Sequence, residues 1–540
     1  MADITTGQTT ADLWDTAGRL FGDRPFLVHV GDGGSRTELS YARFATLIHR
    51  TAHAFRAVGV GFGDRVLLQL GNGPEVIAAL FGLAEIGAIA VPAGMSATPV
   101  ELARTYRRSG ARWAVVEQSR VADHLALRRE PSLAGLCLLV AEGDGTRGGQ
   151  GADLAGSSHQ TEPEGRGVRS LTALRDAQPA TRVVEPRLTD QTVLEVLYTS
   201  GTTAEPKGVM VTHANVVFSG HYGVWQTSLR SDDRLLTTMP SCHSNFQLAA
   251  LTPVLVAGAT LVVADRYSAS RFWSTVRTER ATIVQLIAMM ARTLMLQPPS
   301  PEDGRHELRD ALYFMPLSDT EKAEFERRFR VSLLNSYGST ESIGWAVTDP
   351  PQGERRWPSV GRAGLGYEVA IVDDHGRELP VGQVGEFRIK GVPGRSLMLG
   401  YVDDPAGTAA ALSPDGWLRT HDQGYQDADG WFYFVDRSIN VIKRAGENVS
   451  ATEVECVLTA HPLVAEAAVV GVPDPVRDVA VKAFVRLRAS AAATRQAQVV
   501  EQLLAHCRER LAPYKVPELV EIVDDFPRTD SMKIEKRLLH

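Results

Sequence analysis

The first hundred residues alternate between a helical and a strand-like pattern of apolar positions. Apolar side chains recur every three or four positions over 44–58, which predicts a helix with one buried face. The apolar run 65–70 predicts a buried strand, and a helix over 75–87 and a strand over 88–92 follow. This alternation of strand and helix predicts an α/β fold in which helices cover parallel sheets.

The pattern changes in the last third of the chain. Over 361–435, short β-rich runs are separated by turns such as Asp374-His375-Gly376, which predicts a small β-subdomain. After Asp436-Arg437 the chain returns to mixed helix and strand. We therefore predict a large N-terminal domain over 1–435 and a small α+β C-terminal domain over 436–540. Residues 142–168 are rich in glycine, serine and charge, which predicts a flexible surface excursion rather than a boundary.

Composition excludes several classes of protein. The 540 residues carry 57 Lys and Arg against 64 Asp and Glu, a net charge of −7 without a long basic run, so we expect no nucleic-acid partner. The most apolar stretch, 76–91, contains Glu85 and is shorter than the roughly 20 residues of a membrane span. The four cysteines lie far apart and no secretory signal begins the chain, so we expect a cytoplasmic protein.

The strongest local motif is the segment Tyr198–Gly208, YTSGTTAEPKG, which follows an apolar strand over 193–197. Glycine lets backbone N–H groups approach an anion, hydroxyls donate hydrogen bonds, and lysine supplies a positive charge. The segment is not a Walker loop, whose spacing of glycine and lysine differs. A Ser/Thr-rich surface turn is the alternative, but the strand before the loop favours a polyphosphate site.

This loop resembles the phosphate loop of the adenylate-forming superfamily, which includes acyl-CoA synthetases, peptide-synthetase adenylation domains and luciferases. Four further motifs agree in order: NSYGSTE at 335–341, WLRTHDQG at 417–424, VDR at 435–437 and PRTDSMKI at 527–534. The sequence departs from the family at Ala204, His421 and Met532, where glycine is usual. The resemblance covers nearly the whole chain.

The resemblance implies a nucleotide site. In it, Asp422 binds the ribose hydroxyls, Tyr337 stacks on adenine, and Glu341 holds Mg²⁺, while Thr340 contacts phosphate. Aromatic rings suit stacking, and a hard cation prefers carboxylate oxygen. The other implied nucleotide-binding residues are Thr199, Ser200, Gly201, Thr202, Thr203, Lys207, Asn335, Ser336, Gly338, Phe434 and Arg437. A packed core tyrosine is the alternative for Tyr337 taken alone.

The resemblance also implies an acid pocket and a moving domain. The pocket residues are His243, Ser244, Asn245 and Met315, and we interpret His243 as pocket-lining rather than as a general base. Lys533 bridges the reacting acid and the α-phosphate. Asp436 is the implied hinge, and the implied loop for the second half-reaction contains Lys443, Gly446 and Glu447. We expect the turns near 201 and 338 to lie together beneath the C-terminal domain.

Segments at 267–273, 292–300 and 356–362 look like crotonobetaine/carnitine–CoA ligases. The first hypothesis is therefore a carboxylate–CoA ligase that uses ATP, Mg²⁺ and CoA on a small-molecule acid. An ATP-dependent diazotase, which joins nitrite to AMP for attack by an aromatic amine, is the second hypothesis. An inactive nucleotide-binding protein is the third. A homodimer is possible in each case.

Overall fold

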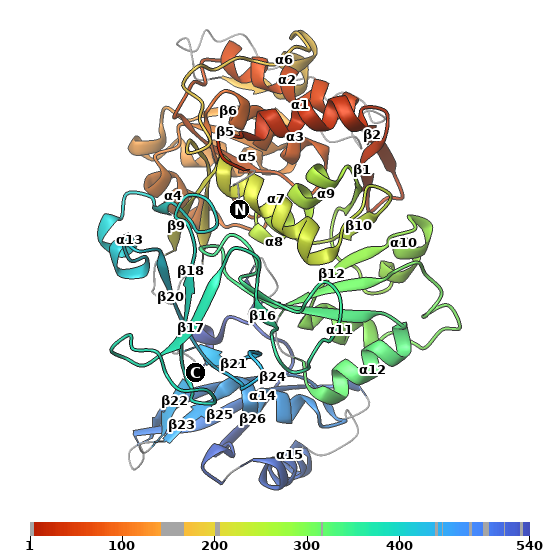
Figure 1. Ribbon diagram of the computed structural model, residues 1–540, viewed down its shortest axis with the longest axis vertical. Helices are drawn as coiled ribbons and strands as arrows, with labels where there is room; N and C mark the ends of the chain where they lie inside the picture. Colours follow the sequence, from red (N-terminus) through yellow and green to blue (C-terminus); the bar gives the residue numbers. More distant parts are fainter. Residues whose placement is uncertain are drawn as a thin grey trace.

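Two large sheets of mostly parallel strands form the upper part of the molecule, and a smaller α+β unit lies at its C-terminal end (Figure 1). The computed structural model describes residues 5–141, 167–199, 206–314, 317–437, 441–444, 447–474, 478–489, 496–511, 513–529 and 533–539. Within these ranges the predicted α/β fold class is confirmed.

The first sheet has the strand order β16-β15-β14-β13-β12-β10-β11-β1-β2 in the described part of the chain. Its central strands run parallel, and β2, β15 and β16 pair in antiparallel fashion at its ends. The strands are β16 (Arg362–Ala363), β15 (Val347–Thr348), β14 (Ser332–Tyr337), β13 (Asp310–Phe314), β12 (Ile283–Ile287), β10 (Arg234–Thr237), β11 (Thr260–Ala264), β1 (Pro25–Val30) and β2 (Arg36–Ser40).

The second sheet has the order β19-β9-β8-β4-β3-β5-β6-β7. It is parallel from β8 to β7, whereas β8 and β9 form an antiparallel pair that leads into and out of the predicted phosphate loop. The strands are β19 (Gly400–Tyr401), β9 (Lys207–Thr212), β8 (Val193–Thr199), β4 (Ile89–Pro92), β3 (Arg65–Gln69), β5 (Trp113–Glu117), β6 (Cys137–Ala141) and β7 (Val168–Ser170).

Helices α1 (Thr10–Phe21), α2 (Tyr41–Ala57) and α3 (Pro74–Glu85) pack together through aromatic side chains. The buried Trp14 lies 4.9 Å from Phe26, 5.5 Å from Phe44 and 5.4 Å from Phe81, measured between ring centroids. Phe44 and Phe55 are fully buried, so the apolar face predicted for the second helix is the face that packs. Strands β3 and β4 and helix α3 also match their predicted ranges within two residues.

Helix α7 (His213–Thr227) carries side chains from the sheet toward the site. Its first turn is closed by a capping box, in which Thr212 and Asn215 bond each other's backbone N–H groups. The helix is buried on most sides, as expected for a helix with few charges. The segment α8 (Ser244–Phe246), a π-helix (Gln247–Leu251) and α9 (Thr252–Ala257) pack beside it.

The remaining helices connect strands or cover the sheets. They are α4 (Pro99–Ser109), α5 (Val121–Leu127), α6 (Leu171–Asp176), α10 (Phe272–Thr278), α11 (Ala288–Met295), α12 (Asp319–Phe329) and α13 (Pro405–Ala411). Short 3₁₀ turns occur at Gln118–Arg120, Pro131–Leu133, Pro513–Lys515 and Lys536–Leu538. In the described ranges no helix combines the length and apolar character needed to cross a bilayer.

A four-stranded antiparallel sheet precedes the C-terminal unit. It consists of β17 (Glu368–Val372), β18 (Gly385–Lys390), β20 (Trp417–Gln426) and β21 (Phe432–Arg437). The C-terminal unit, blue in Figure 1, contains β22 (Val441–Arg444), β23 (Glu447–Ser450), α14 (Ala451–Thr459), β24 (Val464–Asp474), β25 (Asp478–Leu487), α15 (Gln496–Arg510) and β26 (Leu519–Val523).

The C-terminal unit contacts the large part of the molecule through α14. Cys456 of α14 lies close to the ion pair between Arg292 Nε and Glu321 Oε1, which are 2.6 Å apart. Burial raises the pKa of the Cys456 thiol to about 12. Arg292 belongs to α11 and Glu321 to α12, so the charges of both helices act on Cys456 of α14.

Glu195 occupies the interior of β8 with no solvent exposure. Neither of its carboxyl oxygens has a hydrogen-bond partner among the described residues, and the nearby Gln247 has an equally unpartnered Oε1. Burial raises the pKa of Glu195 from 4.5 to about 8. The carboxyl group is therefore protonated at neutral pH, when its O–H can donate to the amide oxygen of Gln247.

This buried acid gives a pH-dependent stability. Between pH 4.5 and 8, Glu195 has lost its proton in the unfolded chain but retains it in the folded protein. The contribution of Glu195 to the free energy of unfolding therefore falls as pH rises. We expect the stability of Glu195→Gln, relative to that of the wild type, to increase from pH 5 to pH 8. The measurement is the difference between the urea midpoints of the two proteins at each pH. Glu368→Gln, a change at an exposed carboxylate, should show no such trend. A constant difference for Glu195→Gln would contradict the assignment.

Candidate active site

The two ends of the predicted phosphate loop meet at the end of β8. Thr199 pairs with Lys207 across the β8–β9 ladder. Lys207 Nζ lies 4.7 Å from the centroid of the Tyr401 ring, and the Tyr401 hydroxyl donates a hydrogen bond of 3.0 Å to Glu341 Oε1. Burial and the negative charge of Glu341 raise the pKa of Tyr401, so the phenol keeps its proton. This chain of contacts brings the base of the phosphate loop to the turn at 338–341.

A second junction joins β14 to the four-stranded sheet. The Tyr337 hydroxyl donates a hydrogen bond of 2.7 Å to Asp422 Oδ2, and Asp422 is only 6% exposed. The Tyr337 ring lies 4.8 Å from Phe387 and 5.9 Å from Phe434, measured between centroids. The residues that the sequence assigns to adenine and ribose are therefore adjacent, and an aromatic surface lies beside a diol acceptor.

Two residues that are predicted to bind the nucleotide make hydrogen bonds within the protein. Asn335 Nδ2 donates to the Ser359 carbonyl at 2.9 Å, and its Oδ1 accepts from the Ser336 backbone N–H at 3.0 Å. The Ser336 hydroxyl accepts a bond of 2.8 Å from Gln226 Nε2. Both side chains stabilise the β14 turn, so their contact with adenine stays a prediction.

His243 and Lys533 come together from opposite ends of the sequence. His243 is the residue before α8, and its Nε2 is buried without a hydrogen-bond partner among the described residues. Burial, together with the positive charge of Lys533, lowers the pKa of His243 to about 4. The Thr529 N–H donates a hydrogen bond of 2.9 Å to the Lys533 carbonyl. The positive charge of the C-terminal lysine therefore acts on His243, a predicted residue of the acid pocket.

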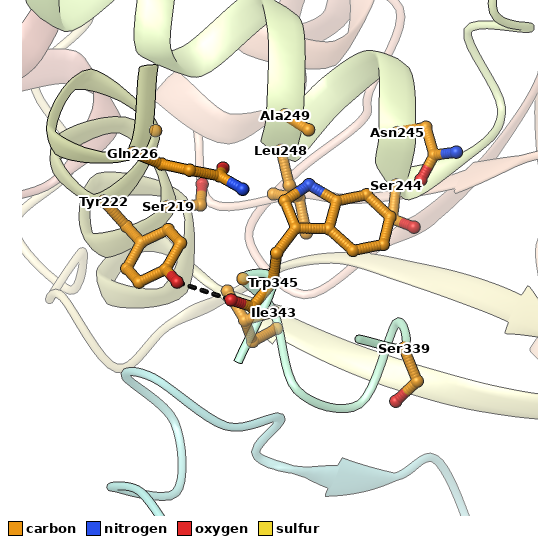
Figure 2. Close-up of a pocket in the computed structure, with 12 residues that line it drawn as sticks. Ser219, Tyr222, Gln226, Ser244, Asn245, Leu248, Ala249, Ser339, Ile343 and Trp345 are labelled. Atoms are coloured by element: carbon orange, nitrogen blue, oxygen red, sulfur yellow. Dashed lines mark hydrogen bonds between the residues drawn. The ribbon is translucent and has the colours of Figure 1, made fainter. Parts of the chain in front are cut away.

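A small cavity lies beside this pair, between α7, the α8 segment and the loop after β14 (Figure 2). Ser219, Tyr222 and Gln226 line it from α7, and Ser244 and Asn245 line it from α8. The space open to the centre of a water molecule is about 20 Å³, room for roughly one water. The Ser244 hydroxyl is 3.4 Å from the Thr340 hydroxyl, so the cavity opens next to the predicted phosphate contacts.

The sequence missed four residues that shape this site. Tyr401 links the two turns, Gln226 supports β14, and Trp345 and Phe314 stack at the cavity with ring centroids 3.9 Å apart. Trp345 lies only four positions after Glu341, so its closeness to the NSYGSTE motif in the sequence could have indicated a place in the site. The other three lie outside every motif, and only the fold brings them to the site.

Several predicted residues lie outside the described part of the chain. These are Ser200, Gly201, Thr202, Thr203, Met315 and Gly446, together with Ala204 and Met532 and most of the predicted excursion at 142–168. The backbones of Asp436, Arg437, Lys443 and Glu447 lie in β21, β22 and β23, but their side chains are not described. The roles predicted for all of these residues stay predictions.

Comparison with known proteins identifies the family. Residues 14–402 match the family described as AMP-binding enzyme, and residues 453–533 match the AMP-binding enzyme C-terminal domain. This chain is an AMP-binding enzyme. The family match confirms the predicted adenylate-forming superfamily and an AMP-forming ligase.

This AMP-binding enzyme is 42% identical over 539 residues to the crotonobetaine/carnitine–CoA ligase of Escherichia coli O45:K1, covering 99% of this chain and 100% of that protein. It shares the fold of an anthranilate–CoA ligase in complex with anthranoyl-AMP, with a TM-score of 0.86, 24% identity, and coverage of 99% and 97% of the two chains. The similarity to the crotonobetaine/carnitine–CoA ligase favours the acid–CoA ligase hypothesis.

A third similarity concerns conformation. MatB from Rhodopseudomonas palustris bound to ATP superposes with a TM-score of 0.83 at 25% identity, covering 98% of both chains. The apo form of the same protein superposes with a TM-score of only 0.73. The AMP-binding enzyme described here therefore resembles the ATP-bound arrangement more than the apo one, in agreement with the position of Lys533 beside His243.

The junction between Tyr337 and Asp422 predicts a specific loss of nucleotide affinity. Asp422→Asn replaces an ionised acceptor of hydrogen bonds with an amide, which weakens bonds to ribose hydroxyls by about 1.5–3 kcal/mol. We expect the Kd for AMP, measured by calorimetry, to rise roughly 10-fold or more. Asp415→Asn, at an exposed site near the start of the same strand, should bind AMP as the wild type does. Equal affinities in the two variants would remove Asp422 from the site.

The lowered pKa of His243 predicts a pH profile. Because this pKa is about 4, the ring is neutral throughout the range from pH 5.5 to 8 and cannot produce an ionisation there. We expect His243→Gln to reduce kcat/KM for the acid while the shape of the pH–rate profile stays that of the wild type. An ionisation near pH 6.5 that is present in the wild type and lost in the variant would show that His243 acts as a base.

Proposed function

We propose that this chain is an ATP-dependent acid–CoA ligase. In the first step an acid oxygen forms a bond to the α-phosphorus of ATP, the bond to the β-phosphate oxygen breaks, and pyrophosphate leaves with the electron pair. In the second step the sulfur of CoA bonds to the acyl carbon, AMP leaves with the electron pair, and the thiol proton passes to solvent. The observation that supports the proposal is the contact of the Thr340 hydroxyl with the hydroxyl of Ser244, which lines the cavity and follows His243 in the chain.

Positioning and charge neutralisation supply most of the catalysis in such a step, because the protein forms no covalent bond itself. Lys207 is the first residue of β9, after the predicted phosphate loop, and Lys533 adds a second positive charge, which acts on His243. Tyr337 and Asp422 position the nucleoside by its base and its ribose hydroxyls. The neutral His243 bounds the space in which the acid lies.

A magnesium ion fits the carboxylate of Glu341. Mg²⁺ binds through one or two protein carboxylates and completes its shell with water and substrate phosphates. Glu341 Oε1 accepts the Tyr401 hydrogen bond, which orients the carboxylate and leaves its second oxygen for a cation. When bound, the ion neutralises phosphate charge. Magnesium, like CoA, enters here as a proposal.

For the second step we propose that the C-terminal unit rotates about Asp436. Withdrawal of Lys533 and entry of the loop with Lys443, Gly446 and Glu447 then let one site serve both reactions. The domain boundary at 435/436, the cytoplasmic location and the homodimer stay predictions.

The size of the cavity favours a second candidate, the activation of nitrite. Here a nitrite oxygen bonds to the α-phosphorus and pyrophosphate leaves, which gives a mixed anhydride of nitrous acid and AMP. The nitrogen of an aromatic amine then attacks the nitroso nitrogen, AMP leaves, and loss of water from the N-nitroso product gives the diazonium ion. Nitrite has no substituent beyond the atoms that react, so it requires no space in the cavity of roughly 20 Å³.

One assay separates these functions. AMP release is measured with formate, acetate, crotonate, crotonobetaine or nitrite, with and without CoA and an aromatic amine. Thioester formation that requires CoA supports the ligase, and AMP release that requires nitrite and amine but not CoA supports the diazotase. If no condition releases AMP or exchanges pyrophosphate, the proposal of an active enzyme is wrong.

The location of Lys533 predicts unequal effects on the two steps. Lys533→Ala removes the positive charge at the acid pocket, so we expect pyrophosphate exchange to fall at least about 100-fold, the range found when one charged transition-state contact is removed. Transfer from a chemically supplied acyl-adenylate to CoA should stay within a few-fold of the wild type. Lys536→Ala, whose lysine pairs with Glu455 at 2.7 Å, is the matched control and should leave exchange unchanged. Equal loss in both steps would contradict the assignment.

A further inference from the structure

We propose that Trp345 closes the acid pocket, so that the enzyme activates only very small oxyacids, with a substituent no larger than a methyl group beyond the reacting group. This inference rests on the proposed function, because it assigns a substrate class to the same site. It also separates this chain from relatives whose names carry larger, cationic acids.

The indole of Trp345 fills the space into which a larger acyl group would extend. Figure 2 shows its ring beneath Leu248 and beside Ser244, across the cavity from Tyr222. The ring stacks on Phe314 at 3.9 Å between centroids and 17° between planes. With the reacting group placed near Thr340, as proposed, the adjoining cavity of about 20 Å³ receives the substituent. That space holds about one water, the size of a methyl group.

The loop that carries Trp345 is fixed by two buried tyrosines. The Tyr222 hydroxyl donates a short hydrogen bond to the Trp345 carbonyl. The Tyr367 hydroxyl donates to the Ser342 carbonyl at 2.6 Å and accepts from the Gly344 N–H at 3.1 Å. Swinging the indole out therefore requires more than a rotamer change, because the backbone on both sides of Gly344 is held.

Backbone strain at Ile343 agrees with a fixed loop. Its φ is +61°, a left-handed conformation that a β-branched residue rarely adopts. Such conformations cost free energy and persist where the surrounding structure determines them. Here the strain directs the chain so that Ile343 and Trp345 both line the cavity. The narrow pocket is therefore a built feature of the loop rather than an effect of one free side chain.

The charge of the lining also argues against a cationic acid. Among the residues that the structure describes, those that line the cavity include no aspartate, glutamate, lysine or arginine. A trimethylammonium group there would lose its hydration without a counter-ion, which is unfavourable. The polar groups present are hydroxyls and amides, including Ser219, Gln226, Ser244 and Asn245. A small uncharged substituent, or none at all, suits this lining.

The test measures substrate size directly. Acid-dependent pyrophosphate release is measured for nitrite, formate, acetate, propionate, butyrate and crotonobetaine. Each methylene in an apolar pocket changes kcat/KM by about 10–200-fold, so we expect at least a 100-fold fall from acetate to butyrate in the wild type. Trp345→Ala should reduce that ratio at least 10-fold, and Trp345→Phe should give an intermediate ratio. Trp113→Ala, a matched change in β5, should keep the wild-type ratio.

A binding series keeps failure of this inference distinct from failure of the proposed function. Affinities are measured for acylsulfamoyl adenosines with formyl, acetyl, butyryl and benzoyl groups, which require no turnover. Weak binding of the butyryl and benzoyl compounds, relieved in Trp345→Ala, supports the inference even where turnover is slow. Equal wild-type affinity across the series, or equal use of acetate and butyrate, overturns the inference while the ligase stands. If no compound binds, the proposed function and the inference resting on it both fall.

Discussion

The site depends on bringing two turns from different sheets against one polyanion. The Lys207–Tyr401–Glu341 chain performs this task in the structure, because Tyr401 faces a cation with its ring and an anion with its hydroxyl. Tyr401 belongs to β19, which pairs with β9 at the edge of the second sheet. The edge strand thus fixes the phosphate-loop sheet relative to the turn after β14. Without that link, each motif is a separate loop with no common ligand.

The parts of this arrangement that were predictable from sequence are local. The helical spacing of 44–58 and the apolar strand before the phosphate loop each report on consecutive residues, and both elements lie where predicted. The glycine and hydroxyl motifs are also short. Trp345 and Phe314 are 31 positions apart, and the link from Lys207 to Tyr401 spans nearly two hundred. Such contacts arise from the order of strands in the sheets, which no local pattern encodes.

Asn335 shows a different limit, because its motif was found but the side chain also makes hydrogen bonds within the protein, and its predicted contact with adenine stays a prediction. Its amide bonds Ser359 and Ser336 and thereby holds the end of β14 in place. The adjacent Tyr337 can then extend to Asp422. A residue can therefore belong to a nucleotide motif because it shapes the turn, even where its side chain does not face the nucleotide. Sequence similarity alone does not separate these two roles.

The charge that acts on the predicted acid pocket comes from the C-terminal segment. His243 is neutral because burial and Lys533 both oppose its protonation. Glu195, deeper in β8, is neutral because burial raises the pKa of its carboxyl to about 8. The cation beside the acid pocket is Lys533, which the C-terminal segment supplies. In the proposed mechanism, an acid that loses its hydration in this cavity is neutralised by Lys533 while the C-terminal unit is in place, and one lysine thereby couples domain position to the first step. A narrow, uncharged pocket strengthens this coupling, because it offers the bound acid no alternative counter-ion.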